Sequence, residues 1–382
     1  MSGTPHPDIA AVILAAGLSS RMGSLKALLP FGTGTVLEHI STAYRKAGVT
    51  NILVVTGHNA GMIGAEAARL GLGTVHNPGY LEGMFSSACT GLAAVLEAGY
   101  RHVFVHPVDI PLVRFDTLAR MAEYGPGLEA DLCLPAFGGE CGHPPLLDAR
   151  VLPQILSWQG EGGLKAAFSG LARCEIPVAD QAVLLDMDTP EAYQKALLLL
   201  ERSGIPSTGE AYALLRLHQV PEKGIAHGRA VSLVARALAE ALNATGATLD
   251  VQLAESAAVL HDIAKGQPRH EETGGKLLRG LGFVRLENIV ASHRDRRLAE
   301  NCPILEADVV YLADKLVRGA GRMSIPDRFA EKIIRYQLDA EATAAICLRR
   351  DNALHMAACF EAATGRQLED VLKPLDLPWN NL

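Results

Sequence analysis

Residues 10–30, AAVILAAGLSSRMGSLKALLP, decide the fold class of the N-terminal half of the chain. The first seven of them, 10–16, are all apolar and have the length of a buried β-strand, which ends at Gly17. Downstream, short apolar runs alternate with helical patterns. The expected strands are 51–57 and 101–107, and the expected helices are 36–47 and 84–98. Strands that alternate with helices are joined by right-handed crossovers, so this pattern predicts a mostly parallel sheet.

The composition of the whole chain excludes several classes of protein. With 382 residues, the chain is longer than one hydrophobic core usually supports, so we expect two domains. It is 49% hydrophobic and 20% charged, which favours a folded protein, and no apolar run is long enough for a membrane span. The net charge of −7 disfavours nucleic-acid binding. The sequence shows neither a signal peptide nor a CxxC pair among its seven cysteines, so we expect reduced thiols in the cytoplasm.

The second half of the chain has a different pattern. The segment SGIPSTG, residues 203–209, is rich in Gly, Pro and Ser, which is typical of a linker. Beyond it, Ala and Leu recur at helical spacing in 226–243, 253–264, 306–318 and 328–363, without a convincing strand. We therefore expect an α/β domain at residues 1–204, a linker at 205–217 and an all-α domain at 218–382.

The loop after the first expected strand combines glycines with positive charge. Gly17 and Gly23 allow a ligand to approach the backbone closely, and backbone N–H groups there can bind phosphate oxygens. Arg21 and Lys26 supply the positive charge that a phosphate attracts. The same residues also fit an ordinary turn with two solvated cations, and their spacing leaves both interpretations open.

Residues 14–32, LAAGLSSRMGSLKALLPFG, resemble the signature loop of the MobA-like nucleotidyltransferases. More narrowly, they resemble the molybdenum cofactor cytidylyltransferase branch, because Ala16 stands where guanylyltransferases usually carry Gly. The family's loop wraps the triphosphate of an NTP, so the resemblance implies a Rossmann-like, mostly parallel nucleotidyltransferase domain in which Arg21 and Lys26 contact phosphates. The implied nucleotide-binding residues of this loop are Leu14, Ala15, Ala16, Gly17, Ser19, Arg21 and Lys26.

Five further segments resemble motifs of the same family, in the same order. They are NPGYLEGM (77–84, followed by Ser86-Ser87), VDIPL (108–112), GHPP (142–145), GEGGLK (160–165) and LDMDTPE (185–191). The GEGGLK segment departs from the family, which more often has Asp, Ala and Arg in that run. The resemblance covers about residues 8–203 and adds Asn77, Gly83 and Ser87 to the nucleotide site. His143, in GHPP, is either a structural loop residue or a contact of the acceptor substrate.

Asp109 directly follows the third expected strand, at the edge where parallel sheets bind ligands. A carboxylate there can hold Mg²⁺, and Asp188, with Asp186 as the runner-up, supplies a second one. Nucleotidyl transfer needs no protein nucleophile, so we expect Lys26, Arg21 and Asp109 to align the phosphates and neutralise charge on the pyrophosphate. The alternatives are a turn role for Asp109 and a helix N-cap role for Asp188.

Four residues of the second half place polar groups on apolar helix faces: His227, His261, Asp262 and Asp314. Their spacing from neighbouring apolar residues puts each one where core side chains point. A single such histidine is most often satisfied within the core. Four residues that converge favour a metal site, because a buried charge is costly unless it is paired or binds a metal.

The segments around these four residues resemble the HD superfamily of metal-dependent phosphohydrolases. The segments are 220–242, 253–266 and 307–319, and the resemblance covers about residues 218–366. It implies an all-α HD domain with His227, His261, Asp262 and Asp314 as metal ligands. His270 and His293 stand where many members add ligands, often for a two-metal site. Mixed histidine and carboxylate ligation is compatible with Mn, Fe, Ni or Zn.

Two basic features of the second half have simpler explanations. Lys265 follows the His261-Asp262 pair, where it either contacts a substrate phosphate or acts as a cation at a helix C-terminus. Arg296 and Arg297 form a basic pair that is usually a solvated face, so we assign it no role.

Together these patterns predict a bifunctional enzyme. We expect the first domain to transfer CMP from CTP to a molybdopterin-type phosphate with Mg²⁺, releasing pyrophosphate, and a molybdoenzyme is a candidate acceptor protein. We expect the second domain to hydrolyse a phosphoester of unknown identity with one or two divalent transition metals. The alternatives are another acceptor, such as a sugar phosphate, and an HD domain that senses a nucleotide without hydrolysing it.

Overall fold

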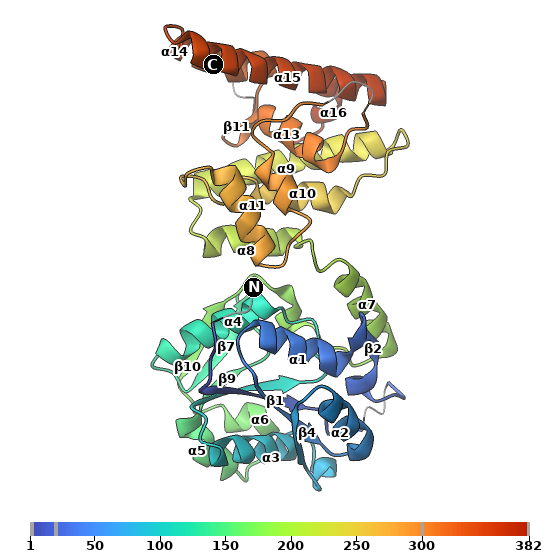
Figure 1. Ribbon diagram of the computed structural model, residues 1–382, viewed down its shortest axis with the longest axis vertical. Helices are drawn as coiled ribbons and strands as arrows, with labels where there is room; N and C mark the ends of the chain where they lie inside the picture. Colours follow the sequence, from blue (N-terminus) through green and yellow to red (C-terminus); the bar gives the residue numbers. More distant parts are fainter. Residues whose placement is uncertain (1–3, 19–21, 299–301, 380–382) are drawn as a thin grey trace. The chain divides into compact units, whose positions relative to one another are not determined.

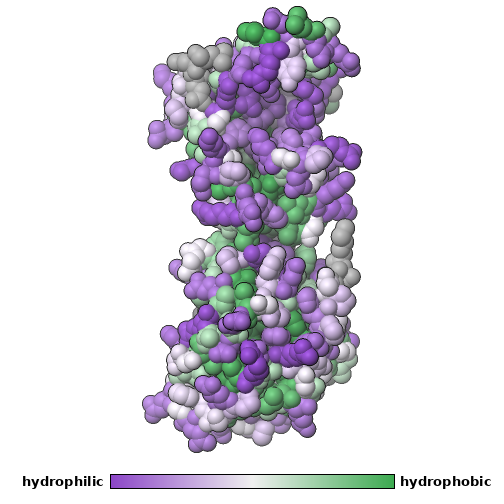
Figure 2. Space-filling model, turned by 90° about the vertical axis from the view of Figure 1, so that its left-hand side faces the viewer, coloured by the Kyte–Doolittle hydropathy of each residue, from purple (hydrophilic) through white to green (hydrophobic). Residues whose placement is uncertain are grey.

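The computed structural model describes residues 4–18, 22–298 and 302–379 of the chain (Figure 1). The chain divides into two compact units, Met1–Arg202 and Ser203–Leu382. Hydrophilic side chains cover much of the face that Figure 2 shows. Among the helices of the described residues, none combines the length and the apolar character that a membrane crossing requires.

The first unit is built on one mixed, mostly parallel sheet. Its strand order is β10-β7-β9-β6-β1-β4-β5, with β8 paired to β7, and β9 is antiparallel to both of its neighbours. The strands are β1 (Ile9–Leu14), β4 (Asn51–Thr56), β5 (Gly73–His76), β6 (His102–Pro107), β7 (Leu132–Phe137), β8 (Glu140–Cys141), β9 (Leu146–Asp148) and β10 (Arg173–Pro177), and a separate hairpin joins β2 (Pro30–Phe31) to β3 (Gly34–Thr35). The expectation of a mostly parallel α/β fold is confirmed.

Helices cover both faces of this sheet, and β1 shows why. Ala11 and Ile13 of β1 enter one hydrophobic core, whereas Ala10 and Val12 enter the other, because successive side chains of a strand point to opposite faces. The first core is closed by α1 (Val36–Lys46), α2 (Ala60–Arg69), α4 (Phe115–Tyr124) and α7 (Pro190–Glu201), and the second by α3 (Met84–Glu97), α5 (Leu152–Leu156) and α6 (Gly163–Ala167). Figure 1 shows α1 and α4 on one side of the sheet and α3 and α5 on the other.

The central strands bring two loops together at the carboxyl edge of the sheet. β1 is parallel to both of its neighbours, β4 and β6. Its last residue, Leu14, is in register with Pro107, the last residue of β6. The loops after β1 and β6 therefore leave the sheet side by side, at the kind of position where open parallel sheets bind ligands.

The described part of the second unit is helical apart from one short hairpin. Its elements are α8 (Thr208–Leu217), α9 (Glu222–Asn243), α10 (Val251–Leu260), α11 (His270–Gly280), α12 (Glu287–Ala291), α13 (Glu306–Lys315), β11 (Val317–Arg318), β12 (Gly321–Arg322), α14 (Ile325–Arg335), α15 (Ala340–Thr364) and α16 (Leu368–Leu372). Val231 and Leu238 of α9, Ala254 of α10 and Val310 of α13 are fully buried and form its centre.

Two glycines let neighbouring helices approach closely. A Cβ atom on Gly228 of α9 would lie 2.6 Å from the carbonyl oxygen of Val259 in α10. A Cβ atom on Gly275 of α11 would lie 2.6 Å from the carbonyl oxygen of Glu287 in α12. Both distances are too short for any larger residue, so the helices depend on glycine at these positions. The close packing of α9 on α10 also brings His227, next to Gly228, toward the end of α10.

Three boundaries in the second unit differ from those in the sequence analysis. Residues 208–217, within the expected linker, form α8, which begins with a capping box and packs on α10. The periodic stretch 328–363 is divided between α14 and α15, because Asp339 caps a new helix. The expected helical stretch 253–264 is helical only as far as Leu260, so His261 and Asp262 lie in the turn that follows α10.

Candidate active sites

Lys26, Asp109 and Asp188 meet at the carboxyl edge of the sheet in the first unit. The Nζ atom of Lys26 lies 3.2 Å from Oδ2 of Asp109 and 2.6 Å from Oδ1 of Asp188. Lys26 begins a short 3₁₀ turn (Lys26–Leu28), Asp109 follows β6, and Asp188 precedes α7. Three segments that are far apart in the sequence therefore supply one charged cluster.

Two cavities share Asp109. One, of about 350 Å³, is lined by the expected nucleotide-binding residues Leu14, Ala15, Ala16, Gly17, Lys26, Gly83 and Ser87, together with Asp109. The other, also of about 350 Å³, is lined by His143, Asp186 and Asp188 as well as Asp109. The charged cluster can therefore act on groups bound in either cavity.

Asn77 supports the first cavity from behind. Its side chain is buried and donates hydrogen bonds to the hydroxyl oxygens of Ser86, at 2.9 Å, and Ser87, at 3.0 Å. Asn77 thereby fixes the first turn of α3, and it does not line the cavity in the part of the chain that the structure describes. Two further expected residues, Ser19 and Arg21, lie outside the described residues.

A buried relay holds the loop that carries Asp109. The hydroxyl of Tyr44 lies 3.0 Å from Nδ1 of His106, and Nε2 of His106 lies 2.9 Å from the carbonyl oxygen of Ile110. Because a carbonyl can only accept, Nε2 carries the proton and Nδ1 accepts from Tyr44. Burial lowers the pKa of His106 to about 4, so the ring is neutral. On the other side of the loop, the backbone N–H of Met187 donates to the carbonyl oxygen of Asp109 at 2.8 Å.

The two carboxylates of this site fit Mg²⁺. Burial raises the pKa of Asp109, and the positive charge of Lys26 opposes that shift. The side chains of Asp109 and Asp188 are 20% and 40% exposed, so an ion and its waters can reach them. Mg²⁺ prefers oxygen ligands and is commonly held by one or two carboxylates together with substrate phosphates, which suits a carboxylate pair at the edge of a cavity.

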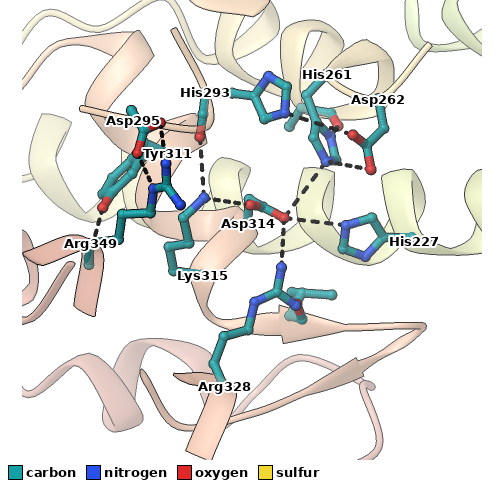
Figure 3. Close-up of polar contacts among 12 residues, drawn as sticks. His227, His261, Asp262, His293, Asp295, Tyr311, Asp314, Lys315, Arg328 and Arg349 are labelled. Atoms are coloured by element: carbon teal, nitrogen blue, oxygen red, sulfur yellow. Dashed lines mark hydrogen bonds and ion pairs between the residues drawn. The ribbon is translucent and has the colours of Figure 1, made fainter. Parts of the chain in front are cut away.

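The second unit gathers all six residues expected to bind metal. They form two groups that share Asp262: His227, His261 and Asp262, and Asp262, His270 and His293. Within each group the ligand atoms lie within 4.8 Å of one another. Asp314 joins the first group, since its Oδ1 atom is 3.3 Å from Nε2 of His227 and 3.7 Å from Nε2 of His261 (Figure 3).

Backbone carbonyls orient three of these imidazoles. The Nδ1 atom of His227 lies 3.0 Å from the carbonyl oxygen of Gly319. The Nδ1 atoms of His261 and His293 each lie 2.7 Å from a carbonyl oxygen three residues earlier. A carbonyl only accepts, so each Nδ1 carries the proton and each Nε2 presents a lone pair. Such bonds fix ring orientation and tautomer in metal sites.

The environment of His261 tests whether a metal fits. Its Nε2 atom is buried and has no hydrogen-bond partner in the described part of the chain. Burial lowers the pKa of His261 to about 4, so this atom is a neutral lone pair that lies close to two carboxylates, Asp262 and Asp314. The lone pair of His261 and the two carboxylates face one another with no proton between them, and this arrangement is favourable only when a cation binds among them. The donor set of imidazoles and carboxylates fits Mn, Fe, Ni or Zn.

Positive side chains keep the carboxylates of this centre ionised. Burial acts to raise the pKa of Asp262, but the charge that the His261 ring carries once it is protonated at acid pH, together with Lys265, outweighs burial and lowers the pKa to about 2. Burial also acts against ionisation of Asp314, but the positive charges of Lys315 and Arg328 hold its pKa well below the usual range. Lys265, for which two roles were open, pairs with Asp262 at 2.5 Å.

Sequence reasoning missed several contacts of the centre. Lys315 is 2.7 Å from Oδ2 of Asp314, and Arg328 is 3.2 Å from Oδ1 of the same residue. Arg296, which was assigned no role, forms an ion pair with the buried Asp308. The sequence does contain a signal for Lys315, because the adjacent charges of Asp314 and Lys315 interrupt an otherwise apolar run. Arg328 comes fourteen residues after Asp314, and no local spacing connects the two.

Comparisons with known proteins agree with this organisation. Residues 11–176 match the family model of the MobA-like NTP transferase domain, and residues 224–319 match that of the HD domain. A molybdenum cofactor cytidylyltransferase of Escherichia coli (strain K12) is 29% identical over 186 residues, which cover 48% of this chain and 92% of that protein.

Two other proteins are similar to the first unit. Nicotine blue oxidoreductase of Paenarthrobacter nicotinovorans is 28% identical over 206 residues, which cover 52% of this chain and 100% of that protein. A solved nucleotidyl transferase from Methanothermobacter thermautotroptrophicus is 25% identical and covers 51% of this chain and 98% of its own, with a TM-score of 0.45. The cytidylyltransferase and the oxidoreductase have different names although both align with the first unit, so the similarity alone identifies no substrate. The chain is an enzyme that contains a MobA-like NTP transferase domain and an HD domain.

Proposed function

We propose that the first unit transfers a cytidylyl group from CTP to the phosphate of a molybdopterin-type acceptor. The observation that carries the proposal is the meeting of Lys26, Asp109 and Asp188 at a point shared by two cavities. The choice of CTP and of this acceptor is supported by the cytidylyltransferase relative, which aligns over 92% of its length. The cavity lined by Gly17 and Ser87 is proposed for the nucleotide, and the cavity lined by His143 is proposed for the acceptor.

In the proposed reaction, an oxygen of the acceptor phosphate forms a bond to the α-phosphorus of CTP. The bond between that phosphorus and its bridging oxygen breaks, and pyrophosphate leaves with the electron pair. Lys26 would donate hydrogen bonds to phosphate oxygens and offset the charge that grows on the pyrophosphate, and Arg21 is proposed as a second such contact. Asp109 and Asp188 would hold Mg²⁺, which when bound stabilises negative charge on the phosphates.

The test is pyrophosphate release from each of the four NTPs with the molybdenum cofactor or a sugar phosphate as acceptor. We expect CTP with the molybdenum cofactor to be preferred at least about tenfold, a difference of ~1.4 kcal/mol in transition-state binding. The Asp109→Asn variant should lower the rate at least about 100-fold. Asp148→Asn is the matched control, because Asp148 pairs with Arg150 away from both cavities. Equal use of GTP would contradict the cytidylyl assignment.

We further propose that the second unit hydrolyses a phosphoester. The observation that carries this proposal is the unpaired Nε2 of His261 within a cluster of six candidate ligand residues, the five of the two groups and Asp314. In hydrolysis, the oxygen of a water molecule bonds to phosphorus, the ester oxygen leaves, and the water's proton ends on the leaving oxygen or in solvent. The two groups that share Asp262 would hold one or two divalent metals, which when bound lower the pKa of water and polarise the phosphoryl oxygen.

Metal analysis of the purified full chain, followed by a panel of phosphoesters with Mn²⁺ or Fe²⁺, tests this second proposal. We expect at least one transition metal per chain and hydrolysis that is lost in a His261→Ala, Asp262→Ala double variant. The cytidylyl transfer of the same variant should be unchanged. Bound metal with no hydrolysis of any ester would instead favour a nucleotide-sensing HD domain.

A further inference from the structure

Lys315 is a lysine buried inside the metal centre, with 6% of its surface exposed. Its Nζ atom donates to Oδ2 of Asp314 at 2.7 Å and to the carbonyl oxygen of His293 at 3.2 Å. It also lies 4.6 Å from the centre of the Tyr311 ring. Asp314 belongs to the first ligand group and His293 to the second, so a single ammonium group contacts one member of each.

The side chain of Lys315 lies in apolar surroundings in which its charge needs specific partners. Leu312, Ala313 and Leu316, its neighbours in the chain, are buried and apolar. Burying an ammonium group there is unfavourable unless partners replace its water. The carboxylate of Asp314, the carbonyl of His293 and the face of Tyr311 provide those partners, which matches the three protons of an ammonium. An apolar side chain would fill the space and leave the two ligands unconnected.

Two later helices hold this arrangement from outside. Arg328 of α14 donates to Oδ1 of Asp314 at 3.2 Å. Arg349 of α15 contacts both oxygens of Asp295, two residues after His293, at 2.5 and 3.1 Å, and its carbonyl oxygen accepts from the Tyr311 hydroxyl at 3.2 Å. Figure 3 shows Arg349 beside Asp295 and Tyr311, and Lys315 between His293 and Asp314. Both helices lie beyond residue 319, where the match to the HD family model ends.

We propose that Lys315 is a positioning residue that joins the two ligand groups of the HD centre, and that α14 and α15 complete this centre through Arg328 and Arg349. Lys315 fixes the orientation of Asp314 and the position of the His293 backbone at the same time. The two groups therefore take up their binding geometry together instead of independently. This inference rests on the proposed function only in that the two groups bind metal, and it does not depend on which phosphoester is hydrolysed.

The test is a titration of the metal-free full chain with Mn²⁺. Calorimetry measures the binding, and electron paramagnetic resonance measures the signal of the bound ions. For the wild type we expect two Mn²⁺ ions per chain and the signal of a coupled pair. Outer contacts of metal ligands typically change affinity 10- to 100-fold, so Lys315→Met should weaken Mn²⁺ binding by roughly that factor and replace the coupled signal with that of isolated ions. Arg349→Leu should weaken the second binding step by about tenfold and leave the first unchanged.

Lys332→Met is the matched control. Lys332 lies on α14, and burial together with the nearby charges of Arg328 and Lys315 lowers its pKa, so its charge acts close to the centre. In the described part of the chain it hydrogen-bonds to neither Asp314 nor His293. This variant therefore removes a nearby charge without removing the two contacts, and its Mn²⁺ affinity should stay within about threefold of the wild type.

The outcomes separate this inference from the proposed hydrolysis. The inference is overturned if the Lys315→Met variant binds Mn²⁺ as tightly as the Lys332→Met variant and gives an unchanged coupled signal. If Lys315→Met does not fold, Lys315→Gln and Arg349→Leu apply the same criterion. A wild type that binds the Mn²⁺ pair but hydrolyses no ester contradicts the proposed activity and leaves the inference standing. A wild type that binds no Mn²⁺ overturns both.

Discussion

The two sites of this chain hold charge in opposite ways. In the first unit, loops present Asp109 and Asp188, whose side chains are 20% and 40% exposed, to a single lysine. In the second unit, the side chains of His261 and His293 are 1% and 4% exposed, and backbone carbonyls fix both rings. An accessible carboxylate pair suits a metal that enters with substrate phosphates, whereas buried, oriented imidazoles suit a metal that stays. The two metals should therefore differ in how firmly they are held and in what they contribute to folding.

The largest expected effect is the loss of the shared ligand of the second site. Asp262→Ala removes the one residue common to both ligand groups, so bound transition metal should fall to near zero. Ester hydrolysis should fall at least about 1,000-fold, because the variant loses both the metal and the water it activates. Metal analysis and the rate of the best ester substrate measure this, and the rate of cytidylyl transfer should stay as it was.

Asp351→Asn is a suitable control for this variant. Asp351 is an exposed carboxylate of the same unit that pairs with Arg350 and belongs to neither ligand group. Its metal content should remain close to that of the wild type. If Asp262→Ala keeps its metal, the assignment of the two groups is wrong.

The next largest effect is the loss of stability when metal is removed, which one experiment can measure in both units. Removing a metal present at 1,000 times its dissociation constant costs about 4 kcal/mol, which for a unit of this size is a fall of about 10 °C in unfolding temperature. We expect a chelator to cause a fall of that order in the second unit. The first unit, measured without nucleotide, should shift by no more than about 2 °C. Differential scanning calorimetry with and without chelator checks this, and equal shifts in both transitions would remove the distinction between a resident and an exchanging metal.

The sequence predicted the sheet of the first unit well, for a physical reason. The run at residues 10–16 is buried on both faces of β1, so its apolar character is unbroken and leaves little choice of structure. The six histidine and aspartate residues of the second unit were equally visible, because polar residues on apolar helix faces are rare. These residue types are therefore visible in the sequence itself, and the structure brings five of them together in the two groups, with Asp314 beside the first.

Contacts between distant segments were not predictable in the same way. Lys26 meets Asp188 across 162 positions of sequence, and Arg349 meets Asp295 across 54. Neither distance follows from local spacing, since both are set by how helices and strands pack. Arg296 was treated as a solvated surface residue, although it neutralises the buried Asp308. A charge run shows that side chains are polar, but only packing shows which of them is covered.

A smaller effect tests how the first site is supported. Its Asp109 loop depends on an indirect relay from Tyr44 through His106 to Ile110, whereas the histidines of the second site are oriented directly by carbonyls. Tyr44→Phe leaves a buried ring nitrogen without its donor, which typically costs 1–3 kcal/mol, so we expect a loss of about 2 kcal/mol in the unfolding free energy of the first unit. Denaturant unfolding measures this loss.

Tyr124→Phe provides the reference for that measurement. Tyr124 is 50% exposed, so removal of its hydroxyl should change stability by less than about 0.5 kcal/mol. In Tyr44→Phe we also expect a higher Mg²⁺ requirement for transfer, because the loop with Asp109 is less well fixed. A variant with full stability and an unchanged Mg²⁺ requirement would show that the relay does not support the site.

The smallest expected effect is a dependence of the first unit's stability on pH, which arises from the same relay. Burial lowers the pKa of His106 to about 4, whereas the unfolded chain binds this proton near pH 6.5. Between these values the unfolded state holds more protons than the folded state, so stability is fully present above pH 6.5 and is lost as the pH falls toward 4. From pH 7.5 to 5.5 the loss from this one group should be about 1 kcal/mol, and it should be absent in His106→Gln. The comparison is made with chelator present, because protons also displace metal from the histidines of the second unit. If wild type and His106→Gln lose the same stability over this range, His106 is not the neutral, buried link that the Asp109 loop requires.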